Sequence, residues 1–481
     1  MVARHPSAQH PRPCKYLALG LARGWPARAW VNRAASAVVC YGVRRPAGWR
    51  GAAVVIAAAA VTAAVVGVLV VREHAPQTAG GQARQRPAAQ AMAPPEVPPR
   101  WSVGGVAPPL VEPSERGPVA AGDLVLVSTG FHEPGRVRAY DARTGRLRWA
   151  YGTGGTAFVW AVGQGRVIVA PDRRSLIALD LETGRERWRL ALSPGQAPEH
   201  GTIAGGHLYI GTSFTSEGDL RPPVVYAVDL ATGRRRWQAV LEPGADLEWG
   251  APVVEGDLVL VADTPSHQGS APTSRLHGLH ADTGRVRWKA DLRSREQGFH
   301  TERPLVIGGL VLTVTTSGAL LAVDAGSGRE VWRERRGPFL PRIVGTSGSL
   351  VFAIMDGSLV ALEARGGNQR WQIPLPVEER EQWAVLAGGT IYAVAAGLVV
   401  AIDPASGTDR WRVRVGQAVG GPLRVGQRVY VATEGQLVAL DAASGGIRWT
   451  SGPRDLATGP IAAGGRVVVT TRDGALLAFA R

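Results

Sequence analysis

One phrase recurs eight times along the chain and always ends in tryptophan. Its first copy reads AYDARTGRLRW and its last reads ALDAASGGIRW. The copies end at Trp149, Trp188, Trp237, Trp288, Trp332, Trp371, Trp411 and Trp449. Successive tryptophans lie 38 to 51 residues apart, and eight of the chain's 15 tryptophans occupy this one position. Such a period indicates a repeat protein, in which each unit buries its apolar surface against neighbouring units.

Each repeat unit carries the pattern of four short strands, which we name A to D in chain order. Before each phrase stands an alternating segment such as GDLVLVS or GHLYIGT, and before that a shorter one such as GPVAAG or GPLRVG. Alternation with a period of two is typical of β-strands, and glycine turns separate the segments. The absence of a 3.6-residue period excludes helical solenoids. Four antiparallel strands in about 40 residues predict the blade of an all-β propeller.

The turn between strands C and D has the pattern D-x-x-T-G. Its aspartates are Asp141, Asp180, Asp229, Asp324, Asp403 and Asp441. We expect each carboxylate to accept backbone N–H groups across the turn, and the following glycine to supply a positive φ. The tryptophan of strand D should fill the wedge between neighbouring blades. His280 and Glu363 replace the aspartate in two units, and Gly366-Gly367 replace Thr-Gly in one of them, so looser turns are expected there.

These units resemble the pyrroloquinoline-quinone (PQQ)-like propeller repeat, whose core phrase is A-L-D-x-x-T-G-x-x-x-W. The resemblance covers residues 101–481. Families with this repeat include quinoprotein alcohol dehydrogenases and the lipoprotein of the outer-membrane assembly machine. Many bacterial surface proteins without an assigned activity also carry it. The resemblance implies an eight-bladed propeller of four-stranded antiparallel blades.

The closure of the ring depends on the two ends of the repeat region. After Trp449 comes a ninth set of strands A, B and C (GPIAAGG, RVVVTTR and ALLAFAR) without a strand D. Upstream, VPPRWSVGG at 97–105 has the pattern of a strand D. We expect this segment, with Trp101, to complete the C-terminal blade and so remove both free sheet edges. The literal count is then nine blades; with eight, one degenerate unit would be displaced.

An apolar segment precedes the repeats. Residues 51–71 form 21 residues without a charge, which as a helix would be about 31 Å long and would match a bilayer core. The nine basic residues of 1–50 predict a cytoplasmic N-terminus and an extracytoplasmic propeller on a single-pass membrane protein. Cleavage as a signal peptide is the alternative, although no small-residue cleavage site follows. Residues 72–99 are a Pro/Ala/Gln-rich linker; 1–50 are a disordered tail or lie before the true start.

The net charge of +15 belongs mainly to the N-terminal region. Residues 1–50 contribute nine basic residues and no acid, and residues 72–100 contribute +2, which leaves +4 for 101–481. A body so close to neutral is not a surface for a phosphate backbone, so no nucleic-acid partner is expected. We expect a monomeric propeller that contacts the membrane through one helix.

The sequence offers no recognisable catalytic constellation. In quinoproteins of the resembling family, calcium is held by acidic and amide side chains, and the quinone lies between a tryptophan and a vicinal disulfide. Here Cys14 and Cys40 are the only cysteines, and Asn32 and Asn368 the only asparagines. The repeated aspartates are interpreted as turn caps rather than metal ligands. We therefore expect no catalytic residue, no metal and no cofactor; PQQ and calcium belong only to the alternative of a divergent dehydrogenase.

Insertions are confined to one face of the expected ring. They lengthen the B–C connections at 212–223 and 263–274, and the D–A connections at 189–201, 238–249 and 289–302. Both kinds of connection lie on the same face of a four-stranded blade, and loops on a rigid scaffold commonly carry recognition. Polar and aromatic residues that begin the inner strands should ring the channel mouth on this face. They are Glu199, His200, Glu248, Trp249, His300, Glu302, Arg303, Arg342, Gln382 and Trp383.

Three hypotheses of function follow. The preferred one is a membrane-tethered, non-catalytic binding or scaffold module for a protein or a small polar ligand at this rim. The competing interpretation is that the rim is no binding site and consists of unrelated polar residues in contact with solvent. The alternatives are a divergent PQQ-dependent dehydrogenase and a sensor ectodomain whose cytoplasmic output is residues 1–50.

Overall fold

A computed structural model describes most of the repeat region. The described residues are 94–105, 117–129, 134–172, 174–193, 196–214, 222–241, 245–246, 251–265, 275–292, 304–315, 318–337, 339–376 and 382–481. The expected tail, the expected membrane helix and most of the expected linker lie outside them. Among the described residues, no helix has the length and apolar character to cross a membrane.

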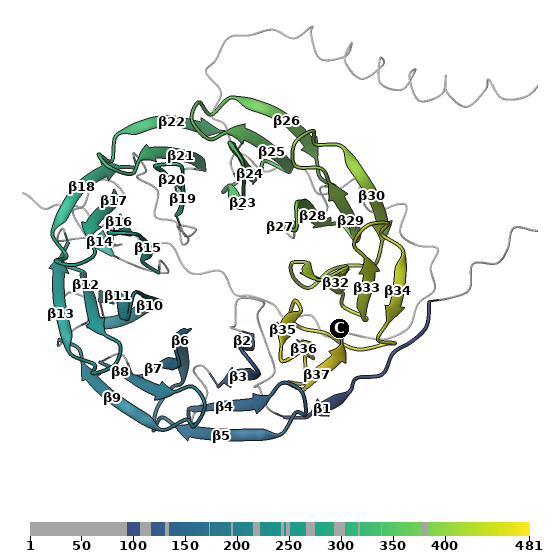
Figure 1. Ribbon diagram of the computed structural model, residues 1–481, viewed down its shortest axis with the longest axis horizontal. Coiled ribbons are helices and arrows are strands. Elements are labelled where there is room, and N and C mark those ends of the chain that lie inside the picture. The colour runs from purple at the N-terminus through teal and green to yellow at the C-terminus, as the bar shows by residue number, and fades with distance from the viewer. Residues whose placement is uncertain are drawn as a thin grey trace, which may run out of the picture. The chain divides into compact units, whose positions relative to one another are not determined.

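The described strands form nine small antiparallel sheets arranged around a central axis (Figure 1). Blade one comprises β2 (Val119–Ala121), β3 (Leu124–Ser128), β4 (Arg136–Asp141) and β5 (Leu147–Gly152). Blade two comprises β6 (Phe158–Gly163), β7 (Arg166–Asp172), β8 (Ser175–Asp180) and β9 (Glu186–Ala191). Blade three comprises β10 (Gln196–Ala204), β11 (His207–Phe214), β12 (Val224–Asp229) and β13 (Arg235–Val240). Blade four comprises β14 (Ala245–Asp246), β15 (Val253–Glu255), β16 (Leu258–Pro265), β17 (Arg275–His280) and β18 (Val286–Asp291).

The remaining blades follow the same order of strands. Blades five and six comprise β19 (Leu305–Ile307), β20 (Leu310–Val314), β21 (Ala319–Asp324) and β22 (Glu330–Arg335); and β23 (Arg342–Ser347), β24 (Leu350–Met355), β25 (Ser358–Glu363) and β26 (Gln369–Pro374). Blades seven and eight comprise β27 (Trp383–Ala387), β28 (Thr390–Ala395), β29 (Leu398–Ile402) and β30 (Asp409–Arg414); and β31 (Leu423–Val425), β32 (Arg428–Ala432), β33 (Leu437–Asp441) and β34 (Ile447–Thr450). Blade nine comprises β35 (Ile461–Ala463), β36 (Arg466–Thr470), β37 (Leu476–Ala480) and β1 (Trp101–Val103).

The ring has nine blades, so the expectation of eight is wrong and the literal repeat count is correct. Every repeat unit forms its own sheet, and no degenerate unit is displaced. The two units with the widest tryptophan spacing keep all four strands and place their extra residues in the connections. Blade number follows from how many units pack side by side, which the spacing of the repeat does not measure.

The expected closure of the ring is confirmed. Strand β1 pairs antiparallel with β37, with Trp101 opposite Ala478, and so supplies the outer strand of blade nine. The N–H of Arg100 donates to the carbonyl of Ala478 at 2.7 Å and extends the pairing. In Figure 1 the purple N-terminal strand lies beside the yellow C-terminal strand. Blade nine therefore joins both ends of the repeat region, and β1 covers the outer edge of β37 that would otherwise be unpaired.

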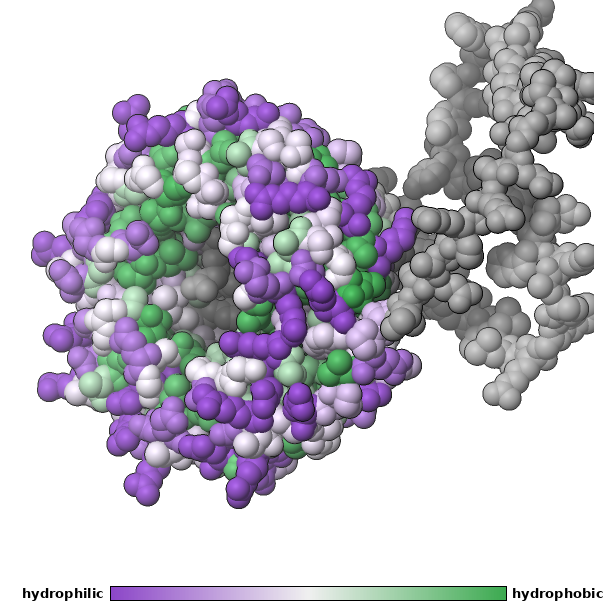
Figure 2. All heavy atoms as spheres, turned by 45° about the vertical axis from the view of Figure 1, so that its right-hand side comes forward, coloured by the Kyte–Doolittle hydropathy of each residue, from purple (hydrophilic) through white to green (hydrophobic). Residues whose placement is uncertain are grey.

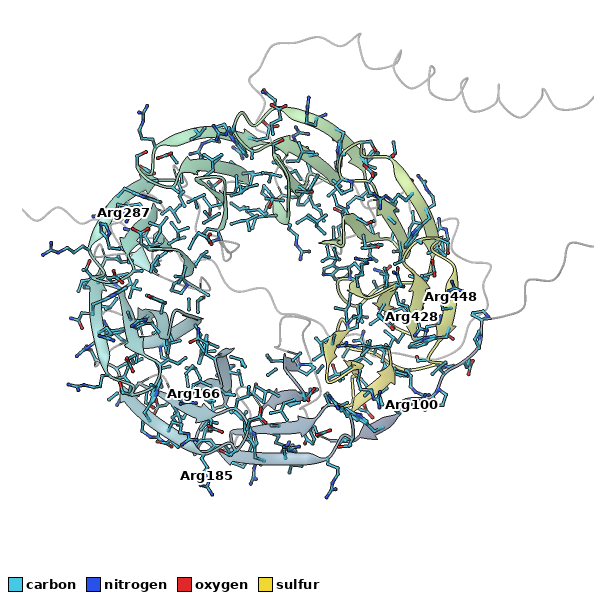
Figure 3. All side chains as sticks on the ribbon, viewed as in Figure 1. Arg100, Arg166, Arg185, Arg287, Arg428 and Arg448 are labelled. Carbon is cyan, nitrogen blue, oxygen red and sulfur yellow. The ribbon has the colours of Figure 1, made fainter. Side chains whose placement is uncertain are left out.

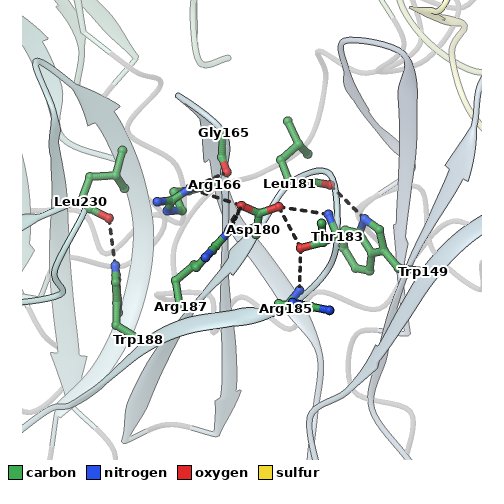
Figure 4. Close-up of polar contacts among 10 residues, drawn as sticks. All are labelled: Trp149, Gly165, Arg166, Asp180, Leu181, Thr183, Arg185, Arg187, Trp188 and Leu230. Atoms are coloured by element: carbon green, nitrogen blue, oxygen red, sulfur yellow. Dashed lines mark hydrogen bonds and ion pairs between the residues drawn. The ribbon is translucent and has the colours of Figure 1, made fainter.

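Every seam but the one between blades eight and nine is built on an indole and the next blade's C–D turn. The indole Nε1–H of Trp149 donates to the carbonyl of Leu181 at 2.9 Å (Figure 4). Gly184 has φ +67° and lies so close to this ring that an added Cβ would be 2.5 Å from Trp149 Cδ2. Glycine therefore serves two purposes here, a left-handed backbone and a close approach of the indole. The equivalent bond joins Trp188 to Leu230, Trp237 to Ala281, Trp288 to Ala325, Trp332 to Ala364, Trp371 to Pro404 and Trp411 to Ala442, at 2.7 to 3.0 Å.

The last seam uses an aromatic partner instead. Blade nine has no C–D turn, because its outer strand comes from the other end of the repeat region. The ring of Trp449 stacks on Phe479 of β37, with centroids 5.8 Å apart and planes 29° apart. Both side chains are buried in one cluster with Tyr430. Stacking thus replaces the turn contact where the repeat is interrupted.

The aspartate of the C–D turn binds groups on both sides of the turn. Asp180 Oδ1 accepts the N–H and the hydroxyl of Thr183 at 3.0 and 2.9 Å, and Oδ2 accepts from Arg187 at 2.7 Å (Figure 4). The bond from Arg187, together with those from Thr183, lowers the pKa of Asp180 to about 2. The arginines of these turns, such as Arg185 and Arg448, lie around the circumference of the ring (Figure 3).

The two turns without aspartate keep the same backbone geometry. The N–H of Gly284 donates to the carbonyl of His280 at 2.8 Å, and the N–H of Gly367 donates to that of Glu363 at 2.8 Å. The corresponding bond from Gly184 to Asp180 measures 2.9 Å. The expectation of looser turns is therefore wrong, because the backbone bonds and the glycine set the turn whatever side chain begins it.

Candidate recognition face

The inner strands line the central axis and present mainly apolar side chains. All five residues of β27 are half-buried, as are the three residues of β19 and of β31. Figure 2 shows a hollow at the middle of the ring, with hydrophobic residues along the part of its wall in view. Among the described inner strands, most positions carry valine, isoleucine, leucine or alanine, so polar recognition would have to come from the rim.

Three of the ten rim residues expected from the sequence are described: Arg342, Gln382 and Trp383. Glu248, Trp249, His300, Glu302 and Arg303 lie outside the described residues; Glu199 and His200 lie on β10, but their side chains are outside the described part of the chain. The expected ring of ten residues therefore stays a prediction.

The structure brings the three described rim residues together at the start of two neighbouring inner strands. Arg342 begins β23 and Trp383 begins β27, and these strands lie side by side in blades six and seven. Arg342 Nη1 donates to the backbone carbonyl of Gln382 at 2.8 Å. Trp383 is half-buried and packs against the cluster that contains Tyr392. Gln382 therefore takes part through its backbone, which its side-chain type did not predict.

An exposed apolar pair adjoins this arginine and was not expected from the sequence. Phe339 is 60% exposed and Leu340 37% exposed, in the D–A connection that leads into Arg342. An added Cβ at Gly318 would lie 3.2 Å from the Phe339 carbonyl oxygen, which places the pair over a B–C turn. The dipeptide FL between two prolines was the available signal, since a surface loop gains nothing from large apolar residues unless they meet a partner.

The other strongly exposed apolar residues are scattered over outer strands. Leu147, Val286, Val331 and Ile447 lie near the start of strand D in four different blades, and Val240 lies at the end of β13. Isolated apolar residues on a surface are ordinary. Phe339 and Leu340 are the contiguous pair among the described exposed residues of this kind.

The described residues were compared with the ligand types of a metal site. Among them, no group of three or more histidine, cysteine, aspartate or glutamate side chains converges as metal ligands would. Asn368 lies in the C–D turn of blade six, where Nδ2 is 3.4 Å from Glu363 Oε2. Asn368 therefore lies in a turn, where the sequence had placed it.

The hydroxyl or carboxylate at the end of strand B has a repeated role on the insertion-bearing face. Its oxygen accepts the N–H of the first residue of strand C, or of the residue just before that strand, and so closes the B–C connection. The acceptors are Thr129, Thr212, Asp263, Thr315, Thr433 and Thr471, at 2.9 to 3.1 Å. This hydrogen bond joins residues three or four apart in blades five, eight and nine, but residues 12 apart in blades three and four. The long connections of these two blades are thus held at both ends.

Comparison with known proteins gives the chain's relatives. The profile of one family, described as outer membrane protein assembly factor BamB, matches residues 133–222, 221–396 and 395–481. BamB of Yersinia pestis is 24% identical over 237 residues, which are 44% of this chain and 54% of that protein. BamB of Vibrio cholerae is 28% identical over 197 residues, 40% of this chain and 36% of that protein.

A quinone-dependent enzyme is also among the relatives. The dehydrogenase subunit of alcohol dehydrogenase (quinone) from Komagataeibacter europaeus is 25% identical over 135 residues, 24% of this chain and 17% of that protein. The matches therefore span between 17% and 54% of the length of these three curated relatives. Among solved structures, BamB from Moraxella catarrhalis is 16% identical, with 80% of this chain and 99% of that chain covered and a TM-score of 0.49.

Proposed function

The chain belongs to the family described as outer membrane protein assembly factor BamB, and from that membership we propose that it is a non-catalytic module that binds a protein partner. The partner docks on the face that carries the B–C and D–A connections. We further propose that residues 51–71 anchor the chain in the cell membrane and that the propeller works outside the cytoplasm.

One observation carries the proposal of a protein partner. Phe339 and Leu340 are exposed side by side on the insertion-bearing face, next to Arg342 at the start of an inner strand. Aromatic and arginine side chains are enriched in protein interfaces, and here an exposed aromatic ring lies close to an arginine, with the leucine adding apolar area. A small polar ligand would gain little from the apolar pair.

The proposal is tested by capture of partners from solubilised membranes. The bait is the full chain, its variant F339S/L340S, and the control L147S, which removes a similarly exposed apolar residue at the start of an outer strand, beside a C–D turn on the opposite face. We expect one partner to be captured by the full chain and by L147S, and its recovery to fall at least tenfold with F339S/L340S. Equal recovery by all three baits, or no specific recovery by any, would reject the proposal.

A quinone-dependent dehydrogenase is the second candidate, and it rests on the relative from Komagataeibacter europaeus. It is tested by adding quinone and calcium to the purified chain. A change in the absorption spectrum together with dye reduction in the presence of an alcohol would favour it over the binding module.

A further inference from the structure

One position of strand C differs in the two blades with long B–C connections. It lies directly before the alanine or glycine that pairs with the tryptophan of strand D. In blades three and four it is a buried side chain with a polar group, Tyr226 and His277. In the other blades the position holds the half-buried Arg138 or a buried aliphatic residue: Ile177, Leu321, Val360, Val400, Val438 and Leu477. A buried polar group costs free energy unless it is hydrogen-bonded, so we asked which groups these two side chains bind.

In blade three the polar residue binds the base of the D–A connection. The hydroxyl of Tyr226 donates to Gln196 Oε1 at 2.5 Å, and both side chains are buried. Ser193 Oγ lies 3.4 Å from the same hydroxyl. Gln196 is the first residue of β10 and pairs with Phe214, beyond the point where other blades end their A–B pairing. Tyr226 therefore fixes the ribbon that β10 and β11 form on the insertion-bearing face.

In blade four the polar residue binds the end of strand B. His277 Nε2 lies 2.5 Å from Asp263 Oδ2, and both side chains are fully buried. Asp263 takes the place of the threonine found in most other blades and still accepts the N–H of Arg275, through Oδ1, at 2.9 Å. The second carboxylate oxygen is what the threonine lacks. It is used to hold His277 at the base of the segment where Thr264 pairs with Asp246 of β14.

Both blades thus use the same repeat position to reach the base of an extended ribbon. The strands concerned are longer than elsewhere: β11 and β16 have eight residues each, whereas β3, β20, β32 and β36 have five. A hydrogen bond at the base of a ribbon restricts its twist relative to the blade and raises the free energy of local opening. Pre-organised surfaces lose less entropy when a partner docks.

We propose that Tyr226 and His277 are positioning residues, which hold the ribbons of blades three and four in one arrangement on the insertion-bearing face. The proposal rests on the proposed function, because it assigns to these residues the regulation of that same face. Neither residue is assigned contact with the partner. Their effect reaches the surface through Gln196 and Asp263.

The test is hydrogen exchange on the full chain, followed amide by amide. The variant Y226F removes one hydroxyl and its bond to Gln196. Its matched control is Y430F in blade eight, because the buried Tyr430 hydroxyl has no hydrogen-bond partner in the described part of the chain. We expect exchange at Ala197, Thr212 and Ser213 to rise about tenfold in Y226F and to stay unchanged in Y430F.

A second variant tests blade four without leaving an unpaired histidine. In D263T/H277V, threonine keeps the bond to the Arg275 N–H and valine occupies the apolar space, as Thr433 and Val438 do in blade eight. We expect this variant to melt close to the wild type while exchange at Asp246 and Thr264 rises about tenfold. Unchanged exchange in both Y226F and D263T/H277V would overturn the positioning role. The exchange readout needs no partner, so it stands or falls separately from the capture experiment, whose failure would reject the proposed function alone.

Discussion

The indole Nε1–H of Trp101 donates to the backbone carbonyl of Ala142 at 3.0 Å, across the seam between blade nine and blade one. Trp101 comes from the N-terminal strand of the repeat region, yet it makes the contact that Trp149 makes with Leu181. An added Cβ at Gly145 would lie 2.7 Å from the Trp101 ring. The glycines of the other C–D turns approach their indoles equally closely. The ring is therefore closed by the same contact that joins its interior blades.

Removing this indole should weaken the whole ring. We expect W101A to lower the free energy of unfolding by about 3 kcal/mol, because it removes a large packed side chain and leaves the seam open at blade one. The control is S102A, on the exposed side of the same strand. Unfolding is followed in urea by intrinsic fluorescence and circular dichroism. A W101A midpoint equal to that of S102A would show that the closing seam adds nothing to stability.

Gly165 and Gly184 share a left-handed backbone conformation, but only Gly184 also lies against an indole. Substituting each of them therefore separates the cost of the backbone conformation from the cost of the steric clash. Gly184 and Gly165 have φ of +67° and +73°, but an added Cβ would meet Trp149 at Gly184 and open space at Gly165. We expect G165A to cost about 1 kcal/mol for the left-handed backbone alone. For G184A we expect at least about 3 kcal/mol, since the indole must also move. The free energy of unfolding of both variants is measured by chemical denaturation. Equal losses would mean that the indole can move away from residue 184 at no cost.

The turn aspartates predict loss of stability in acid. The pKa values of Asp180 and Asp403 are lowered from 3.8 to about 2, in each case first by the bond from an arginine, Arg187 and Arg410. A carboxyl whose pKa is lower in the folded chain stabilises the fold when ionised. This contribution is present at neutral pH and is lost as the pH falls from about 4 toward 2.

The measurement is the thermal midpoint as a function of pH. We expect the midpoint of the wild type to fall steeply below about pH 4. The variant D180N/D403N should melt lower at pH 7 and show a shallower fall between pH 4 and pH 2, since two of the titrating groups are gone. A parallel curve for the variant would mean that other carboxyls cause the acid transition.

Restoring the repeat phrase in blade six should stabilise the chain. Glu363 reaches Arg370 at 3.2 Å but has no threonine three residues later, where Gly366 stands. In E363D/G366T we expect the bonds that Asp180 makes with Thr183, and a gain of about 1 kcal/mol in the free energy of unfolding. The single variant G366T separates the loss of glycine flexibility from the new bonds. A double variant no more stable than G366T would contradict the assigned role of the aspartate.

Much of this architecture can be predicted from short stretches of the sequence. Four alternating segments, a D-x-x-T-G turn and one tryptophan per unit are read within about 40 residues, because strand alternation and turn chemistry depend on near neighbours. The sequence also predicts that the strand with Trp101 completes the last blade. The C-terminal unit lacks a strand D, and the N-terminal segment 97–105 has the pattern of one. Of the candidate site, the sequence indicated the insertion-bearing face but not the exposed pair Phe339 and Leu340.

The contacts between distant residues, both within and between blades, could not be predicted from the sequence. The number of blades depends on how sheets pack around an axis. The hydrogen-bond partner of each indole is a backbone carbonyl in the following unit, 31 to 44 residues away in the seven interior seams that use this bond. Inside blades three and four, the bonds of Tyr226 to Gln196 and of His277 to Asp263 join residues 30 and 14 apart, which the repeat pattern does not predict. Periodicity identifies the unit and its turns, but burial and hydrogen-bond partners across units exist only once the ring has formed, because packing rather than spacing brings these side chains together.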